Sequence, residues 1–209
     1  MDGSMTDKRP LTRCSLAATL WLCVGTSVFA QDTALHSGKY EQLMLAVTPE
    51  HQVEGYYAET RGEAFSCAFY LQGKVEVGKG AAVSSWLDDV YPGTLKASAD
   101  GVVLTIEQGR HHPGCMNVLA PDIATGLDLT RTASKQWIGL VTVTADKAWL
   151  QKTPNAKATR GAYIVKDDVV GVLAFKEGAA QVEFINADDR SFTGWISQDQ
   201  YARLAAPGR

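Results

Sequence analysis

The sequence predicts an all-β protein built in two parts. Short segments of alternating apolar and polar residues recur, as in residues 51–59 and 181–185, and this period of two is typical of strands. Turn-forming residues separate these segments every eight to twelve positions in the second half, and no segment keeps a helical period. We therefore expect a β-barrel or sandwich over residues 31–135 and a small barrel over residues 136–209.

Residues 1–30 have the three parts of a secretory signal. Three basic residues within positions 8–13 precede an uncharged stretch at positions 14–31, and Val28-Phe29-Ala30 forms a cleavage site before Gln31. A membrane anchor is the alternative, but the stretch is near the lower limit of roughly 20 residues for a span and no basic residue follows it directly. We expect a cleaved signal, a periplasmic or secreted protein, and no stable membrane span after cleavage.

The charge of the remaining 179 residues disfavours some partners. Removing residues 1–30 takes away three basic and two acidic residues, which leaves 17 basic and 21 acidic residues and a net charge of −4. No cluster of Lys and Arg with interleaved aromatic residues is present. Because nucleic-acid binding depends on basic surfaces, we expect no nucleic-acid partner.

The cysteines predict one disulfide. Cys14 and Cys23 belong to the signal, and the bulky residues before Cys23 disfavour a lipoprotein. The remaining pair, Cys67 and Cys115, is expected to be oxidised in an exported protein. Cys67 lies in a predicted strand and Cys115 in an irregular loop at residues 108–122, so the bond would fix this loop to a sheet. Two free thiols are the alternative.

The first part contains several predicted strands. Residues 51–59 and 64–71 alternate, and the second segment places Phe65, Cys67, Phe69 and Leu71 on one face. Residues 93–97 and 102–107 flank Ala99-Asp100-Gly101, which is a hairpin signal. A short strand at 127–129 follows the irregular loop. These residues resemble no particular family.

The second part contains strands predicted at 138–144, 147–150, 161–165, 169–175, 181–185 and 193–196, followed by a short helical turn at 197–201. Residues 144–204 resemble a bacterial Src-homology-3 domain. The resemblance rests on Trp149-Leu150, Pro154, Gly161 to Lys166, Asp168, Val169 to Val172, Val182 to Phe184, Gly194-Trp195-Ile196 and Asp199 to Leu204. The family usually has glycine where Asp167 stands, and often has a tryptophan where Ala179-Ala180 stand.

This resemblance implies a small barrel with an aromatic ligand groove. Its candidate ligand-binding residues are Tyr163, Trp195, Tyr201 and Asp168. Aromatic side chains with polar tips are common binding anchors, although aromatics also dominate the cores of small barrels. Bacterial domains of this kind often accompany cell-wall hydrolases, which implies a peptidoglycan fragment or a protein as the partner.

The sequence offers no complete catalytic or metal site. His111-His112 and Cys115 contain three metal-ligating groups, but adjacent histidines point in different directions in an extended chain and the disulfide would consume the thiol. The paired acids Asp88-Asp89, Asp167-Asp168 and Asp188-Asp189 lie at predicted turns. No phosphate-binding glycine loop or serine-hydrolase elbow is present, so we expect no cofactor, no metal and no catalytic residue.

We therefore predict an exported, non-catalytic binding protein that recognises a protein or a cell-wall fragment. An inhibitor or an immunity-type protein, which blocks a toxin or a wall-degrading enzyme, is the most concrete version. The alternative is a cell-wall hydrolase that uses Cys115 as nucleophile and His112 as base, with the Src-homology-3-like part as a targeting domain.

Overall fold

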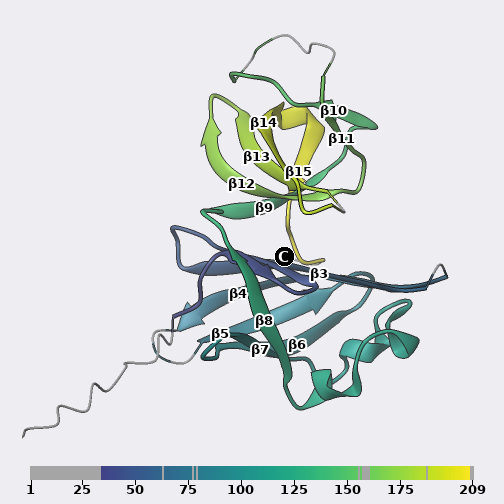
Figure 1. Cartoon of the computed structure of the whole chain (residues 1–209). Helices are drawn as coiled ribbons and strands as arrows, with labels where there is room; N and C mark the ends of the chain where they lie inside the picture. Colours follow the sequence, from purple (N-terminus) through teal and green to yellow (C-terminus); the bar gives the residue numbers. More distant parts are fainter. Residues whose placement is uncertain are drawn as a thin grey trace, which may run out of the picture. The chain divides into compact units, whose positions relative to one another are not determined.

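Antiparallel sheets make up the structure, a computed structural model, as the sequence predicts (Figure 1). It describes residues 34–62, 64–76, 78, 80–154, 156, 161–186 and 188–207. The predicted export signal, with Cys14, Cys23 and the cleavage site at Ala30, lies outside the described residues. Among the described residues, no helix has the length and apolar composition needed to cross a bilayer.

Eight strands close into the first barrel, each hydrogen-bonded to the next, and the last pairs with the first. The strands are β1 (Gly38–Tyr40), β2 (Leu43–Val47), β3 (Gln52–Arg61), β4 (Phe65–Glu76), β5 (Gly80–Trp86), β6 (Val90–Ala97), β7 (Gly101–Thr105) and β8 (Leu127–Ser134). Three 3₁₀ helices lie between β7 and β8: η1 (Gly109–His111), η2 (Cys115–Asn117) and η3 (Pro121–Ala124). They occupy the segment predicted to be irregular.

The Asp100-Gly101 hairpin is confirmed, whereas β1, β2 and β5 have no counterpart among the strands predicted from the sequence. Ala97 pairs with Val102 across the β6–β7 turn, as the hairpin signal indicated. The prediction contains no strand at β5, because Gly, Ala and Ser dominate this segment and have little intrinsic preference for strands. β5 is a strand here because it is paired on both sides, with β4 and with β6.

Side chains from alternate positions fill the interior of the barrel. Cys67, Phe69 and Leu71 on β4 point into the core, as predicted. Phe65 follows the same alternation but is 55% exposed, because it stands at the first position of β4, at the rim of the barrel. The barrel therefore has a packed interior in which an apolar core holds the strands together.

A second sheet of five antiparallel strands follows, in the order β14-β13-β12-β9-β15. Its strands are β9 (Gly139–Val143), β12 (Val169–Lys176), β13 (Ala179–Ile185), β14 (Ser191–Ser197) and β15 (Tyr201–Arg203), with the 3₁₀ helix η4 (Gln198–Gln200) before β15. A two-stranded ribbon, β10 (Lys147–Trp149) and β11 (Tyr163–Val165), connects to this sheet through the bridge between Gln151 and Trp195. The sheet and ribbon enclose a core of their own.

The turn at Asp167 has the backbone conformation that favours glycine. Asp167 has φ of 69°, in the left-handed region where most side chains are strained and where aspartate is tolerated better than most. Asp168 follows it, and its Oδ2 accepts a hydrogen bond from the backbone N–H of Val165 at 3.2 Å. A glycine would suit this position.

The barrel and the five-stranded sheet belong to one compact unit, residues 31–209. Tyr56, Tyr70 and Trp86 form a row of rings on the outer face of β3, β4 and β5, with ring centroids 5.2 and 5.7 Å apart. This face shares an apolar cluster with residues of the sheet, including Leu140 and Val169. The apolar outer face of the barrel is therefore covered by the second sheet.

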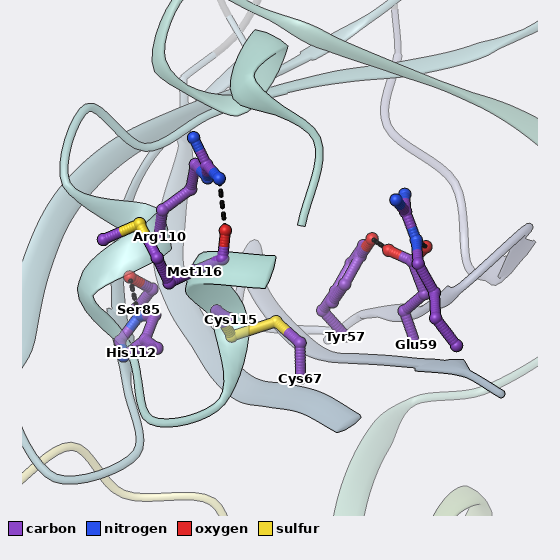
Figure 2. The surroundings of a disulfide bond; sticks show 9 residues. Tyr57, Glu59, Cys67, Ser85, Arg110, His112, Cys115 and Met116 are labelled. Carbon is purple, nitrogen blue, oxygen red and sulfur yellow. Dashed lines mark hydrogen bonds and ion pairs between the residues drawn. A yellow bond between two sulfur atoms is a disulfide. The ribbon is translucent and has the colours of Figure 1, made fainter. Parts of the chain in front are cut away.

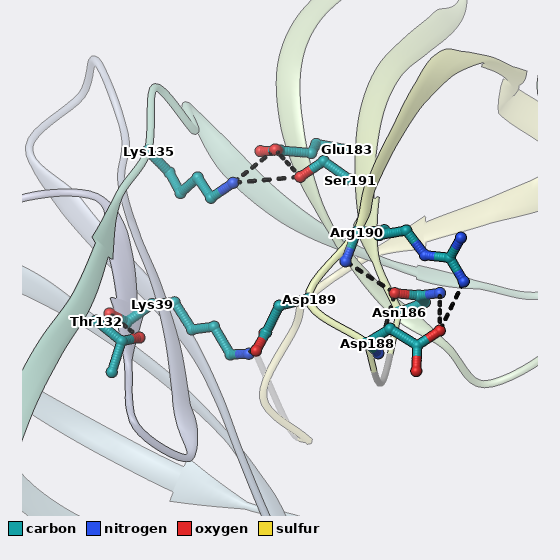
Figure 3. A network of polar contacts seen from close by, with 9 residues as sticks. All are labelled: Lys39, Thr132, Lys135, Glu183, Asn186, Asp188, Asp189, Arg190 and Ser191. Atoms are coloured by element: carbon teal, nitrogen blue, oxygen red, sulfur yellow. Dashed lines mark hydrogen bonds and ion pairs between the residues drawn. The ribbon is translucent and has the colours of Figure 1, made fainter.

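A buried polar network fixes the segment between the barrel and the sheet. Glu183 on β13 accepts hydrogen bonds from Lys135 at 2.6 Å and from Ser191 at 2.6 Å (Figure 3). It also accepts a hydrogen bond from the Trp137 ring at 2.7 Å. Burial alone would raise the pKa of Glu183, but these three donors outweigh it and lower the pKa. Trp137 lies directly over Gly171, so the indole leaves no room for a side chain there.

Candidate functional site

A cavity of about 350 Å³ lies where the β2–β3 end of the barrel meets the second sheet. Glu50 and Glu54 line it from the barrel, and Phe175 and Arg203 line it from the sheet. The volume is at the lower end of the range for small-molecule sites, about 300–1,000 Å³. The cavity therefore combines room for a small ligand with charges of both signs.

Glu54 is held in one orientation at the wall of this cavity. Its Oε2 accepts a hydrogen bond from the backbone N–H of Leu140 at 2.7 Å. Gly139 lies close beside it, and a Cβ at that position would be 3.0 Å from Oε2, so the carboxylate would have to move by a few tenths of an ångström. Burial raises the pKa of Glu54, while the Leu140 N–H and the charge of Arg203 act in the opposite direction. The carboxylate is therefore fixed and partly desolvated.

Arg203 supplies the cationic group of the cavity. Its Cζ lies 4.1 Å from the centroid of the Phe175 ring, so the guanidinium stacks on an aromatic face. Within the described part of the chain, no hydrogen bond or ion pair engages the side-chain N–H groups of Arg203. A guanidinium has five donors in a rigid fork that matches a carboxylate or a phosphate. This fork is held in place and available to a ligand.

A second cavity, of about 320 Å³, shares the Phe175 and Arg203 walls. Tyr201, Gln198 and Gly178 also line it. The Tyr201 ring lies 6.3 Å from the Phe175 ring. The stacked pair of Phe175 and Arg203 therefore separates two adjoining cavities, and one of the four predicted binding residues, Tyr201, is part of this site.

The other three predicted residues lie in different surroundings. Tyr163 is 43% exposed on β11, packs edge-on against Trp149 at 5.0 Å, and has the Lys147 ammonium 4.9 Å from its ring centroid. Trp195 is half-buried, and its backbone forms the bridge to the ribbon. Asp168 closes its turn, and burial raises its pKa. None of these three lines either cavity, and their proposed role in binding remains a prediction.

Cys67 and Cys115 form the predicted disulfide (Figure 2). The bond joins β4 to η2, and both cysteines are buried. Arg110 donates a hydrogen bond to the backbone oxygen of Met116 in the same loop. Gly114 lies so close to β4 that a Cβ there would be 2.1 Å from the Ser66 oxygen. In the disulfide-bonded form neither sulfur is a thiolate, which is the nucleophilic form of cysteine.

Ser85 and His112 form a buried pair beside this loop (Figure 2). The Ser85 Oγ and the His112 Nε2 are 2.9 Å apart, and both residues are almost fully buried. The Ser85 Oγ also lies 3.3 Å from the backbone oxygen of Tyr91, and when the hydroxyl donates there, the His112 Nε2–H donates to Ser85. A catalytic histidine would instead accept the serine proton. Among the described residues, the His112 Nδ1 has no hydrogen-bond partner. The geometry is that of a structural contact under the loop.

The His111-His112 segment does not assemble a metal site. His111 is exposed and His112 is buried against Phe69, with ring centroids 4.8 Å apart. In the described part of the chain, no group of three or more His, Cys, Asp or Glu side chains is placed to hold a metal ion. The arrangement found near Cys115 is therefore a packed corner of the barrel.

Sequence reasoning did not identify Glu54, Phe175 and Arg203 as a site. Glu54 belongs to a correctly predicted alternating strand, and its place on the outer face is readable from the buried Val53 and Gly55 beside it. The sequence contains no signal that a second sheet covers this face. Comparison of the chain with protein-family models, with curated proteins and with solved structures finds no match.

Proposed function

We propose that the chain is an exported, non-catalytic binding protein of the periplasm that recognises a fragment of the cell wall. One observation carries the proposal: the Arg203 guanidinium, stacked on Phe175, stands between two adjoining cavities with its donors available. Wall peptides end in carboxylates, and a fixed guanidinium fork binds a carboxylate with two parallel hydrogen bonds.

The binding role has more support than the hydrolase alternative. That alternative needs a thiolate at Cys115 and a basic histidine at His112. The two sulfurs are bonded to each other, and burial lowers the pKa of His112 to about 4 while Asp89 and Asp88 act in the opposite direction. A buried imidazole in contact with Ser85 lacks access to a substrate.

The proposal is tested by titrating the purified protein with soluble muropeptides in a calorimeter. We expect binding, a loss of at least tenfold in affinity for Arg203→Ala, and partial retention for Arg203→Lys, which keeps the charge but loses the fork. Arg61→Ala is the matched control. Arg61 is an exposed arginine at the other end of β3, about 30 Å from Gln52 at a rise of about 3.3 Å per residue.

Binding of muropeptides with equal affinity by wild type and Arg203→Ala would remove this site from the proposal. Failure of the protein to bind any wall fragment would contradict the proposal itself. Export has its own test, which is the mass of the protein recovered from a periplasmic extract. We expect a chain that begins at Gln31 and contains no alkylatable thiol without reductant.

A protein partner is a second candidate, favoured by a face at the opposite end of the barrel. Successive strands are antiparallel, so the β3–β4, β5–β6 and β7–β8 connections lie at the same end. This end carries four exposed apolar residues, which we call the barrel-end face: Phe65, Leu87, Val90 and Met116. Asp88 and Asp89 lie between Leu87 and Val90, so the face combines apolar and acidic groups.

A face of this kind suits a cationic partner, such as a wall-degrading enzyme that the protein would inhibit. We expect the protein to slow hydrolysis of a wall suspension by lysozyme, used as the cationic probe, and Phe65→Ser with Met116→Ser to abolish the effect. Arg203→Ala should leave it unchanged. Equal inhibition by the double variant would remove the barrel-end face as the interface.

A further inference from the structure

The charges of the cavity beside Arg203 are divided between its two walls. Glu50 in the β2–β3 turn and Glu54 on β3 belong to the barrel, whereas Arg203 on β15 belongs to the sheet. The charge of Arg203 is felt by both carboxylates. In the described part of the chain, however, Arg203 forms no ion pair with either. Opposite charges therefore face one cavity from two sides and leave it open.

Glu54 has one carboxylate oxygen to offer a ligand. Oε2 is used by the Leu140 N–H, whereas Oε1 has no hydrogen-bond partner among the described residues. Because this side chain is half-buried, a cation beside Oε1 would meet a carboxylate that water screens incompletely. The anionic wall is thus as well fixed as the cationic wall, where Phe175 supports Arg203.

We propose that this cavity takes a zwitterionic ligand, a short peptide or amino-acid conjugate whose carboxylate binds Arg203 and whose ammonium binds Glu54, with Glu50 beside it. The inference rests on the proposed function and specifies its ligand. The ligand would bridge the barrel and the sheet, and the volume of about 350 Å³ suits a molecule of two or three small residues.

The charge pattern discriminates against simpler ligands. A simple anion would be attracted by Arg203 but repelled by Glu50 and Glu54. A simple cation would be attracted by the two glutamates but repelled by Arg203. Like charges placed close together repel one another and lower affinity. A ligand with both charges satisfies both walls, and this is the source of the selectivity that we infer.

The test uses three forms of alanyl-alanine: the unblocked dipeptide, its C-terminal amide and its N-acetyl derivative. Binding is followed by chemical-shift changes in the NMR spectrum of the whole purified protein. We expect the unblocked form to bind at least tenfold more tightly than either blocked form. The D,D and L,L dipeptides are compared as well, because wall peptides contain D-residues. Tighter binding of the D,D form would identify the cell wall as the source of the ligand. Tighter binding of the L,L form would identify peptides derived from proteins as the source.

Two variants test which wall of the cavity binds the ammonium group and which binds the carboxylate. Glu54→Gln keeps an oxygen that accepts from the Leu140 N–H, so the fold is preserved while the charge is removed. It should lose the preference for the free amine and bind the N-acetyl form as wild type does. Arg203→Ala should lose the preference for the free carboxylate. Reversal of these assignments would contradict the proposed orientation.

The outcomes separate this inference from the proposed function. If the N-acetyl form binds as tightly as the unblocked dipeptide, and Arg203→Ala weakens both, the zwitterion inference is wrong and carboxylate recognition at Arg203 stands. If the amide binds as tightly as the unblocked form and Arg203→Ala leaves the affinity for both unchanged, then the zwitterion inference and carboxylate recognition at Arg203 are both wrong. If muropeptides bind through Arg203 but no dipeptide binds at millimolar concentration, the inference alone is overturned.

Discussion

Reduction of the disulfide between Cys67 and Cys115 should cost a large part of the stability of the protein. The bond joins positions 48 residues apart in the sequence. For a closed loop of this length, the chain-entropy relation gives a stabilisation of about 4 kcal/mol at 25 °C, through the conformations that the cross-link removes from the unfolded chain. Domains are commonly stable by about 5–15 kcal/mol, so the loss would be a substantial fraction.

The assay is urea unfolding of the same protein, oxidised and reduced, followed by tryptophan fluorescence. With a slope near 2 kcal/mol per molar urea, the midpoint should fall by about 2 M on reduction. Comparing two redox forms keeps both buried sulfurs in place, so no cavity contributes. A Cys67→Ala, Cys115→Ala variant is the control and should be insensitive to reductant. A loss below about 1 kcal/mol on reduction would refute the reasoning, because it would show that the loop is restrained equally well without the bond.

Three further changes test the fold. The pKa of His112 is lowered to about 4 in the folded state from an ordinary 6.5, so the unfolded chain takes up a proton first as the pH falls. The free energy of unfolding should therefore decrease by up to about 3 kcal/mol between about pH 6.5 and pH 4. In urea titrations at a series of pH values, the His112→Phe variant should show a smaller decrease over this range. Gly171→Ala places a Cβ 2.2 Å from the Trp137 indole nitrogen. We therefore expect the free energy of unfolding, measured by thermal unfolding, to fall by about 1–3 kcal/mol, and an unchanged melting temperature would contradict this packing. Asp167→Gly relieves a left-handed residue with φ of 69° and should raise stability by up to about 1 kcal/mol, whereas a clear loss would mean that the Asp167 side chain makes a contact that matters.

Much of the fold could be predicted because its signals are local. The alternation in residues 51–59 and 64–71 and the Asp100-Gly101 turn each depend on a few neighbouring residues, and the disulfide depends on the compartment and on an even cysteine count. β5 was not predicted for the converse reason. Residues Gly80 to Trp86 have a weak intrinsic preference for strands, and the segment becomes a strand because it pairs with a neighbour on each side.

The candidate site could be predicted only in part because it is a tertiary feature. Glu54 and Arg203 lie far apart in the sequence, and each is an ordinary charged residue on the outer face of its strand. What brings them to one cavity is the packing of the outer face of the barrel, with Tyr56 and Tyr70, against the second sheet. Tyr201 was predicted because aromatic residues carry a general binding signal.

The central claim is that the guanidinium of Arg203 binds the carboxylate of the ligand. It is tested most directly by following the arginine Nε–H signals in a ¹⁵N–¹H spectrum while a muropeptide is added. We predict that the Arg203 signal shifts with the occupancy of the site, while the signals of Arg61 and Arg190, which are paired with Glu59 and Asp188, stay in place. A muropeptide that binds without moving the Arg203 signal would contradict the account.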